Sequence, residues 1–184
     1  MLGARLINGD FLALNLSEIF PDKYAIIGNF PYNISSQILF KVLENRDKVV
    51  EMVGMFQKEV AERCASKSGS KEYGILSVLI QAYYDIEYLF TVKPGTFNPP
   101  PKVNSGVIRL SRNNVDKLPC DEKLFWRTVK AGFNQRRKTL RNALSGVVTK
   151  EKMDEHPFFD KRAEQLSVGD FISLTQHLAK LIQS

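Results

Sequence analysis

The feature that most constrains the fold is an alternation of strand-like and helix-like segments in the first 110 residues. Residues 24–28 form a short apolar run of β type, which a Pro-Asp-Lys turn precedes and Asn-Phe-Pro follows. From Ser35 the apolar residues recur at helical spacing, and Ser35 or Ser36 is the candidate N-cap. Further strands are expected at 49–56, 86–92 and 106–110, and further helices at 58–65 and 74–83. This order predicts a parallel α/β sheet with helical crossovers.

The pattern changes between residues 111 and 119, a polar stretch with an Asn-Asn pair and a proline. Beyond it the apolar residues recur only at helical spacing, with helices expected at 124–133 and 136–144. A last helix is expected to begin at the capping box formed by Ser167 and Asp170. We therefore predict an α/β part over residues 1–112 and a small all-α domain over residues 113–184.

Composition excludes several classes of protein. The chain is 43% hydrophobic and 25% charged, as soluble folded proteins are and disordered ones are not. Its longest uncharged run, residues 24–40, contains asparagines, serines and a proline, and is too polar for a membrane span. Because Cys64 and Cys120 lack metal-ligand spacing, we expect no metal site, no disulfide and a cytoplasmic location.

The positive charge is concentrated in one third of the chain. The formal net charge is +6, and residues 93–150 hold 13 Lys and Arg against three acids. A surplus confined to one region suggests a surface that faces a polyanion such as a nucleic acid. An ordinary solvated surface is the alternative, and composition alone does not choose between them.

The tetrapeptide Asn29-Phe30-Pro31-Tyr32 directly follows the first predicted strand, where ligands of open α/β sheets bind. The Asn29 side-chain oxygen and the Phe30 carbonyl can accept both hydrogens of a nucleobase amine and draw its nitrogen towards tetrahedral geometry. Pro31 stiffens the loop, and Tyr32 offers a face on which an extruded base can stack. This composition suits methyl transfer to an exocyclic amine. The alternative is a plain turn that ends a strand.

Four motifs, in register along the chain, resemble the KsgA-type family of rRNA adenine N6-dimethyltransferases. They are Gly9-Asp10-Phe11, N-F-P-Y-N-I-S-S-Q-I from Asn29, F-N-P-P-P-K-V-N-S-G-V from Phe97, and A-G-F-N-Q-R-R-K-T-L-R-N-A-L from Ala131 with the later Leu166-Ser167-Val168. The resemblance runs from about residue 9 to about residue 181. It implies a partial Rossmann-like (class I) methyltransferase sheet followed by a small all-α domain.

The resemblance also implies an activity, which is dimethylation of N6 of two adjacent adenines in small-subunit (16S) rRNA of the 30S ribosomal subunit. The methyl donor would be S-adenosylmethionine. The resemblance places five residues at the catalytic site, namely Asn29, Phe30, Pro31, Tyr32 and Phe97. It assigns three residues to cofactor binding, namely Asp10, Phe11 and Asn29. The Asp10 carboxylate would accept a hydrogen bond from the amine of the cofactor's adenine. The alternatives are that Phe97 is a core aromatic residue and that Asp10 caps a turn.

The basic region of the helical part fits RNA binding, and the residues assigned to it are Arg136, Arg137, Lys138, Arg141 and Lys102. On the expected helix over 136–144, Arg137 and Arg141 are i, i+4 neighbours with Lys138 alongside. Such a cationic stripe can supply the phosphate contacts by which folded RNA is held. A solvated helix face is the alternative.

One family motif has no counterpart in this sequence, namely the glycine-rich E-x-G-x-G-x-G turn that holds the methionine end of the cofactor. We therefore expect that the chain lacks the N-terminal third of a typical member and by itself methylates RNA at no useful rate. Two other functions stay open: a non-catalytic RNA-binding or ribosome-assembly module, and a large-subunit rRNA adenine methyltransferase of the antibiotic-resistance type.

The same expectation has a consequence for the sheet. Without the preceding strand of the family, residues 24–28 become an edge strand with an apolar centre and no charge. Such an edge is a template for strand addition. We therefore predict that the chain self-associates, through this edge or by exchanging its N-terminal residues, or else keeps this region mobile.

Overall fold

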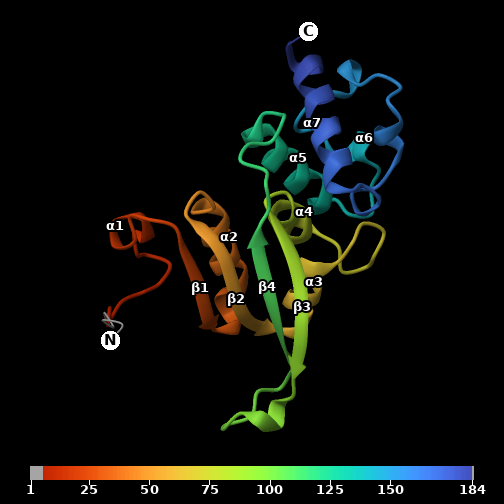
Figure 1. Ribbon diagram of the computed structural model, residues 1–184. Coiled ribbons are helices and arrows are strands. Elements are labelled where there is room, and N and C mark those ends of the chain that lie inside the picture. The colour runs from red at the N-terminus through yellow and green to blue at the C-terminus, as the bar shows by residue number, and fades with distance from the viewer. Residues whose placement is uncertain (1–5, 184) are drawn as a thin grey trace.

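The computed structural model describes residues 6–183, and within them it contains a four-stranded sheet (Figure 1). The strands are β1 (Tyr24–Asn29), β2 (Val49–Gln57), β3 (Tyr84–Val92) and β4 (Ser105–Arg112), in the spatial order β1-β2-β4-β3. β1 and β2 are parallel, whereas β4 is antiparallel to both of its neighbours. The prediction of a wholly parallel sheet is therefore wrong for β4. The reason is that the connection over residues 93–104 holds only a 3-10 turn, and no helix carries the chain back across the sheet.

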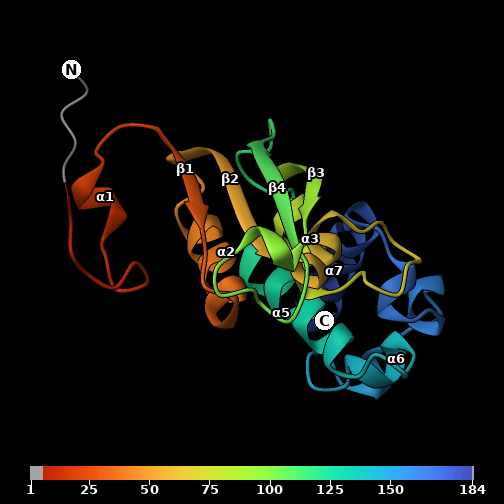
Figure 2. The same cartoon turned by 90° about the horizontal axis from the view of Figure 1, so that it is seen from below.

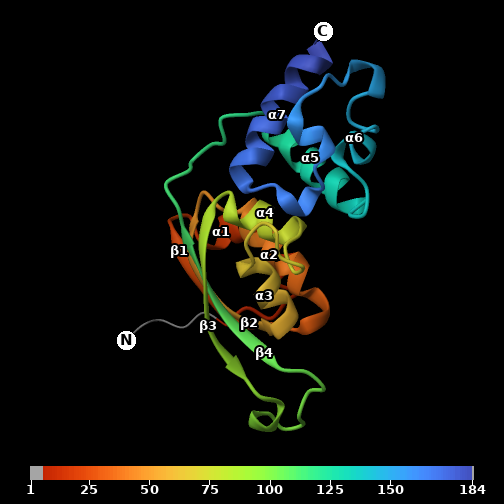
Figure 3. The ribbon, with the colours of Figure 1, turned by 90° about the vertical axis from the view of Figure 1, so that its right-hand side faces the viewer.

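Three helices cover one face of the sheet: α2 (Ser35–Glu44), α3 (Lys58–Ala65) and α4 (Ile75–Gln81) (Figure 3). The apolar residues of α2 are buried as their spacing predicted, namely Ile38, Leu39, Val42 and Leu43. The predicted N-cap is wrong, because Ile34 holds that position and the Ser35 hydroxyl donates to the Tyr32 carbonyl at 2.9 Å. A 3-10 helix (Tyr32–Ile34) runs directly into α2 and leaves no place for a side-chain cap.

Residues 6–23, which precede β1, lie beside the sheet without adding a strand to it (Figures 1 and 2). This segment contains the short helix α1 (Leu16–Ile19), whose N-cap Asn15 accepts from the Ser17 N–H at 3.2 Å. The Lys41 ammonium donates to the carbonyls of Leu12 and Leu14, both at 2.7 Å, and so fastens this segment to α2. β1 is thus an edge strand, as predicted.

Beyond β4 the described chain forms helices and 3-10 turns. The helices are α5 (Glu122–Asn134), α6 (Leu140–Ala143) and α7 (Val168–Gln183), and the 3-10 helices are Lys150–Lys152, Pro157–Asp160 and Ala163–Gln165. The predicted capping box is confirmed, since the Ser167 hydroxyl accepts from the Asp170 N–H at 3.1 Å and Asp170 accepts from the Ser167 N–H at 2.9 Å. The division into domains at residue 112 stays a prediction.

The helix expected over residues 136–144 is wrong. α5 ends at Asn134, residues 136–138 form a turn, and α6 begins only at Leu140. The Leu140 N–H donates to the carbonyl of Lys161 at 2.8 Å, a residue from a distant part of the chain, instead of to the residue four positions back. This long-range bond fixes Thr139 in an extended conformation and separates the two helices.

The elements have a simple arrangement in space. Figure 1 shows the loop over residues 93–104 at the lower end of the sheet, with α5, α6 and α7 beyond the upper end. The carboxyl end of β1 points towards that lower loop. Along residues 6–183, no helix has the length and apolar character needed to cross a membrane.

Candidate active site

The site is built where β1 ends. Asn29 is the last residue of β1 and pairs with Met55 of β2, and Phe30 then donates its N–H to the Met55 carbonyl at 3.3 Å. Pro31 is extended, and Tyr32 starts the 3-10 turn into α2. The tetrapeptide therefore crosses from a parallel strand into a helix at the carboxyl edge of the sheet, where open α/β sheets bind ligands.

An open depression of about 350 Å³, here called the site depression, lies at this place. It is lined by Asn29, Phe30, Pro31 and Tyr32 and, from the loop between β3 and β4, by Phe97, Pro99 and Pro101. Asn29 is exposed, and within residues 6–183 its side chain has no hydrogen-bond partner. The structure thus brings Phe97 to the loop Asn29–Tyr32 and, among residues 6–183, leaves the Asn29 amide without a partner. The catalytic roles of these residues stay predictions.

The Phe30 ring is anchored in the sheet. It stacks on the fully buried Phe56, with ring centroids 5.3 Å apart and planes 18° from parallel. A methyl group on Gly28 would lie 2.6 Å from the Phe30 ring, and one on Gly54 would lie 3.0 Å from it. Both glycines are needed for this close approach, and sequence analysis missed them. Because the half-buried ring is stacked on Phe56, we assign to the backbone carbonyl of Phe30 the part that it could play at the site.

Tyr32 has a partner that sequence analysis also missed. Its hydroxyl oxygen lies 2.5 Å from the hydroxyl oxygen of Ser105 in a hydrogen bond. Ser105 is fully buried at the start of β4. The motif that begins at Phe97 contains this serine, but its spacing gives no sign of the contact.

The two residues assigned to the cofactor differ in their placement. The Phe11 ring lies beside Phe30, with centroids 6.2 Å apart, so it borders the catalytic loop. Asp10 is exposed and closes a turn, in which its Oδ1 accepts from the Leu12 N–H at 2.9 Å. This is the capping role that we named as the alternative. Its Oδ2 has no partner within the described part of the chain and remains available as an acceptor.

The predicted basic stripe does not form. Arg136 donates to the Lys71 carbonyl. Arg141 donates to the Asp154 carbonyl at 3.1 Å and lies over the Phe159 ring at 5.4 Å. Because the helix breaks at Thr139, Arg137 and Arg141 are not neighbours on one helix face.

Two cations of this region are free to bind. Arg137 and Lys138 are exposed, and their side chains have no partner among residues 6–183. Lys102 is likewise exposed and unpaired there, in the loop that carries Phe97. We call residues 136–138 the basic turn from here on.

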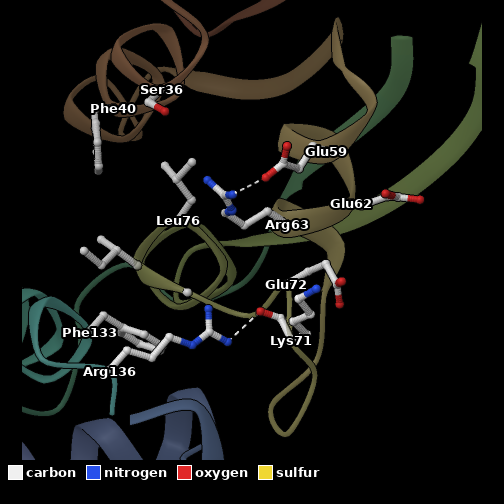
Figure 4. A pocket seen from close by; sticks show the side chains of 12 residues that line it. Ser36, Phe40, Glu59, Glu62, Arg63, Lys71, Glu72, Leu76, Phe133 and Arg136 are labelled. Atoms are coloured by element: carbon white, nitrogen blue, oxygen red, sulfur yellow. Dashed lines mark hydrogen bonds and ion pairs between the residues drawn. The ribbon is translucent and has the colours of Figure 1, made fainter. Parts of the chain in front are cut away.

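A cavity of about 640 Å³ lies between α2, α3, α4 and the end of α5 (Figure 4). Its charged lining residues balance: Glu59, Glu62 and Glu72 against Arg63, Lys71 and Arg136. Within it Arg63 donates to Glu59 at 2.8 Å, and Arg136 points to the Lys71 carbonyl. A lining without net charge does not attract a polyanion, so this cavity adds nothing to nucleic-acid binding.

Neither cysteine is a nucleophile at neutral pH. Burial raises the pKa of the Cys64 thiol to about 12. Burial, with the carboxylates of Glu122 and Asp121 nearby, raises the pKa of the Cys120 thiol to about 11. Both therefore remain protonated thiols. The part of the chain that the structure describes contains no group of three or more His, Cys, Asp and Glu side chains arranged to hold a metal ion.

The mixed sheet, the helices on one of its faces and a site at the carboxyl end of β1 define an α/β fold, and comparison with solved structures shows that two methyltransferases share this fold. A dimethyladenosine transferase from Plasmodium falciparum matches with a TM-score of 0.77 at 24% identity, over 94% of this chain and 71% of that one. The 23S rRNA methyltransferase ErmE matches with a TM-score of 0.63 at 20% identity, over 92% of this chain and 70% of that one. At these identities the likeness concerns the fold.

The chain belongs to the ribosomal RNA adenine dimethylase family, whose model matches residues 4–180. A relative from Cytophaga hutchinsonii, ribosomal RNA small subunit methyltransferase A, is 64% identical over 174 residues, which are 95% of this chain and 67% of the relative. A protein of the same name from Parabacteroides distasonis is 56% identical, over 97% of this chain and 69% of its own length. The chain thus spans about two thirds of the length of these relatives.

Proposed function

We propose that this chain carries the catalytic loop of an S-adenosylmethionine-dependent methyltransferase that dimethylates N6 of adjacent adenines in small-subunit rRNA. The observation that supports the proposal is the site depression, which is lined by the Asn29 amide, without a partner among residues 6–183, together with the aromatic rings of Tyr32 and Phe97. The names of the relatives, which are 56 to 64% identical, support the choice of the small ribosomal subunit.

The chemistry needs acceptors rather than a strong base. The lone pair of an adenine amine is conjugated into the ring, so the nitrogen is a poor nucleophile. The Asn29 Oδ1 and the Phe30 carbonyl would accept its two hydrogens and draw it towards tetrahedral geometry, which frees the lone pair to attack the methyl carbon. After the methyl group has arrived, the nitrogen is acidic and releases its proton to water. Tyr32 and Phe97 would hold the extruded base between them.

The residues beside the loop Asn29–Tyr32 fit one part of the methyl donor, namely its adenine end. S-adenosylmethionine supplies an electrophilic methyl group when it is bound. The free Oδ2 of Asp10 can accept from the amine of its adenine, and the Phe11 ring lies close enough to the loop to border that adenine. Asn29 would then face both the donor and the target base. These contacts would hold the adenine end of the cofactor.

A large folded RNA suits the arrangement better than a short oligonucleotide does. The loop over residues 93–104, part of which lines the site depression, and the helical part lie at opposite ends of the sheet (Figure 1). β2 has nine residues and therefore spans about 30 Å, at roughly 3.3 Å per residue. Lys102 lies beside the depression, and the basic turn lies beyond the other end of the sheet. Both can contact phosphates of one RNA only if that RNA extends over this length. The 30S subunit offers such an RNA, and a cytoplasmic location stays a prediction.

The basic turn provides a test of RNA binding. We expect the double variant Arg137→Ala/Lys138→Ala to bind RNA more weakly and to flatten the dependence of log Kd on log salt by about one unit per lost phosphate contact. A filter-binding titration of a ribosomal RNA fragment at several salt concentrations measures both quantities. The matched control, Lys67→Ala/Lys180→Ala, removes two exposed cations elsewhere. Equal salt slopes for the two double variants would assign the basic turn to the solvated surface.

Methyl transfer tests the function itself. With methyl-labelled S-adenosylmethionine and small ribosomal subunits from a strain that lacks the modification, we expect the 184-residue chain to form N6-dimethyladenine only at a rate too slow to be useful, and robust formation would contradict this expectation. Asn29→Ala should lower the rate by about 100-fold or more, because it removes an acceptor that acts in the transition state. Asn33→Ala, at an exposed neighbouring position, should keep the rate within about twofold. Equal rates for Asn29→Ala and the unchanged chain would contradict the proposed role of Asn29.

A further inference from the structure

Ser105 is held as firmly as any side chain near the site depression. It is fully buried and is the first residue of β4, where it pairs with Gln57 of β2 and with Val92 of β3. A residue in a strand with hydrogen-bonded neighbours on both sides has little freedom to move. Its hydroxyl, 2.5 Å from that of Tyr32, therefore gives the tyrosine a fixed point of attachment.

The same place is where the loop that carries Phe97 returns to the sheet. Directly before Ser105, the Asn104 carbonyl accepts from the Lys58 N–H at 2.9 Å, so the end of the loop is fastened to the start of α3. Tyr32 and Phe97 both line the site depression, Tyr32 from the loop after β1 and Phe97 from the loop between β3 and β4. The hydrogen bond between Tyr32 and Ser105 thus joins the loop after β1 to the base of the loop opposite.

We propose that Ser105 is a positioning residue, which through its hydrogen bond to Tyr32 sets the angle of the tyrosine ring opposite Phe97 for stacking of an extruded adenine. Ser105 does not line the site depression, so it acts through Tyr32 and not on the base. The hydrogen bond holds the Tyr32 hydroxyl at the sheet, so that the face of the Tyr32 ring is directed into the depression. This proposal rests on the proposed function, because it concerns the base that the depression receives.

Base stacking can be followed without catalysis. The probe is a single-stranded RNA in which one adenine is replaced by 2-aminopurine, whose fluorescence is quenched when it stacks on an aromatic ring. The 184-residue chain is expected to quench it, and Ser105→Ala to quench it about threefold less, while Kd stays within about twofold because phosphate contacts hold the RNA. Tyr32→Phe keeps the ring but loses the bond, so it should show the same loss. The double variant should lose no more than either single one, since both remove the same bond.

Two further variants make the result decisive. Ser111→Ala changes a serine at the other end of β4 and should quench like the unchanged chain. Tyr32→Ala removes the ring and should abolish quenching. If Tyr32→Ala abolishes it while Ser105→Ala and Tyr32→Phe leave it unchanged, the positioning role is overturned and the proposed function stands. If Tyr32→Ala also leaves it unchanged, base stacking itself fails. Should Ser105→Ala not fold, Tyr32→Phe alone decides in the same way.

Discussion

Replacing Phe56 by alanine is expected to lower the free energy of unfolding by about 4 kcal/mol, within the range for deletion of a buried aromatic side chain. Phe56 is fully buried in β2, and the Phe30 ring stacks on it. The substitution therefore removes apolar contacts from the core and leaves a cavity beneath the catalytic loop. Urea denaturation measures the change as a lower midpoint at an unchanged slope.

The control for this substitution is Phe90→Ala. Phe90 is 56% exposed on β3, so its truncation should change the free energy of unfolding by less than about 1 kcal/mol. The two substitutions delete the same atoms and differ in burial. Equal effects at the two positions would mean that β2 does not lie in the core in solution.

The second large effect concerns the open edge of the sheet. We expect the 184-residue chain to pass from monomer to dimer as its concentration rises, because among residues 6–183 β1 has a hydrogen-bonded neighbour strand on one side only, and it has no charge along its length. Ile27, in the interior of β1, is 86% exposed. Ile27→Lys should weaken association by about tenfold or more, since a pair of facing strands would bring two like charges together. Light scattering over a concentration series measures this.

The matched control places the same lysine on the other edge of the sheet. Leu89 on β3 is 37% exposed, and Leu89→Lys should leave the dimer constant within about twofold. Hydrogen exchange gives an independent measure, because edge amides over residues 24–28 should exchange faster in the monomer than in the dimer. A chain that stays monomeric at all concentrations and has strongly protected amides there would contradict edge pairing.

Local patterns in the sequence predicted the elements well where neighbours in sequence decide the structure. The helix expected at 58–65 is α3 with the same bounds, and the strand expected at 49–56 is β2 with one residue more. The direction of β4 depends on pairing with β2 and β3, which no local pattern contains. The same holds for the break at Thr139, because the carbonyl that receives the Leu140 N–H belongs to Lys161.

The site shows the same division. The resemblance to a family selected Asn29, Tyr32 and Phe97, and the structure places all three around one depression. Ser105 could not be selected from the sequence, because its partner Tyr32 lies 73 residues away. A single buried serine forms no motif with a recognisable spacing. The charge count selected a basic region, whose contact with RNA stays a prediction. It could not tell that Arg141 is occupied by backbone carbonyls of residues 153 and 154.

The two edges of the sheet differ, and this limits how far association can go. The outer strand β3 carries the exposed acids Asp85 and Glu87, and its pairing is irregular between Tyr88 and Phe90, two features that discourage strand addition. When two copies pair through β1, each copy contributes the same strand edge to the contact, so the contact is isologous. The joined sheet then ends in β3 on both sides. Growth of the assembly therefore closes at two copies instead of continuing into a fibre.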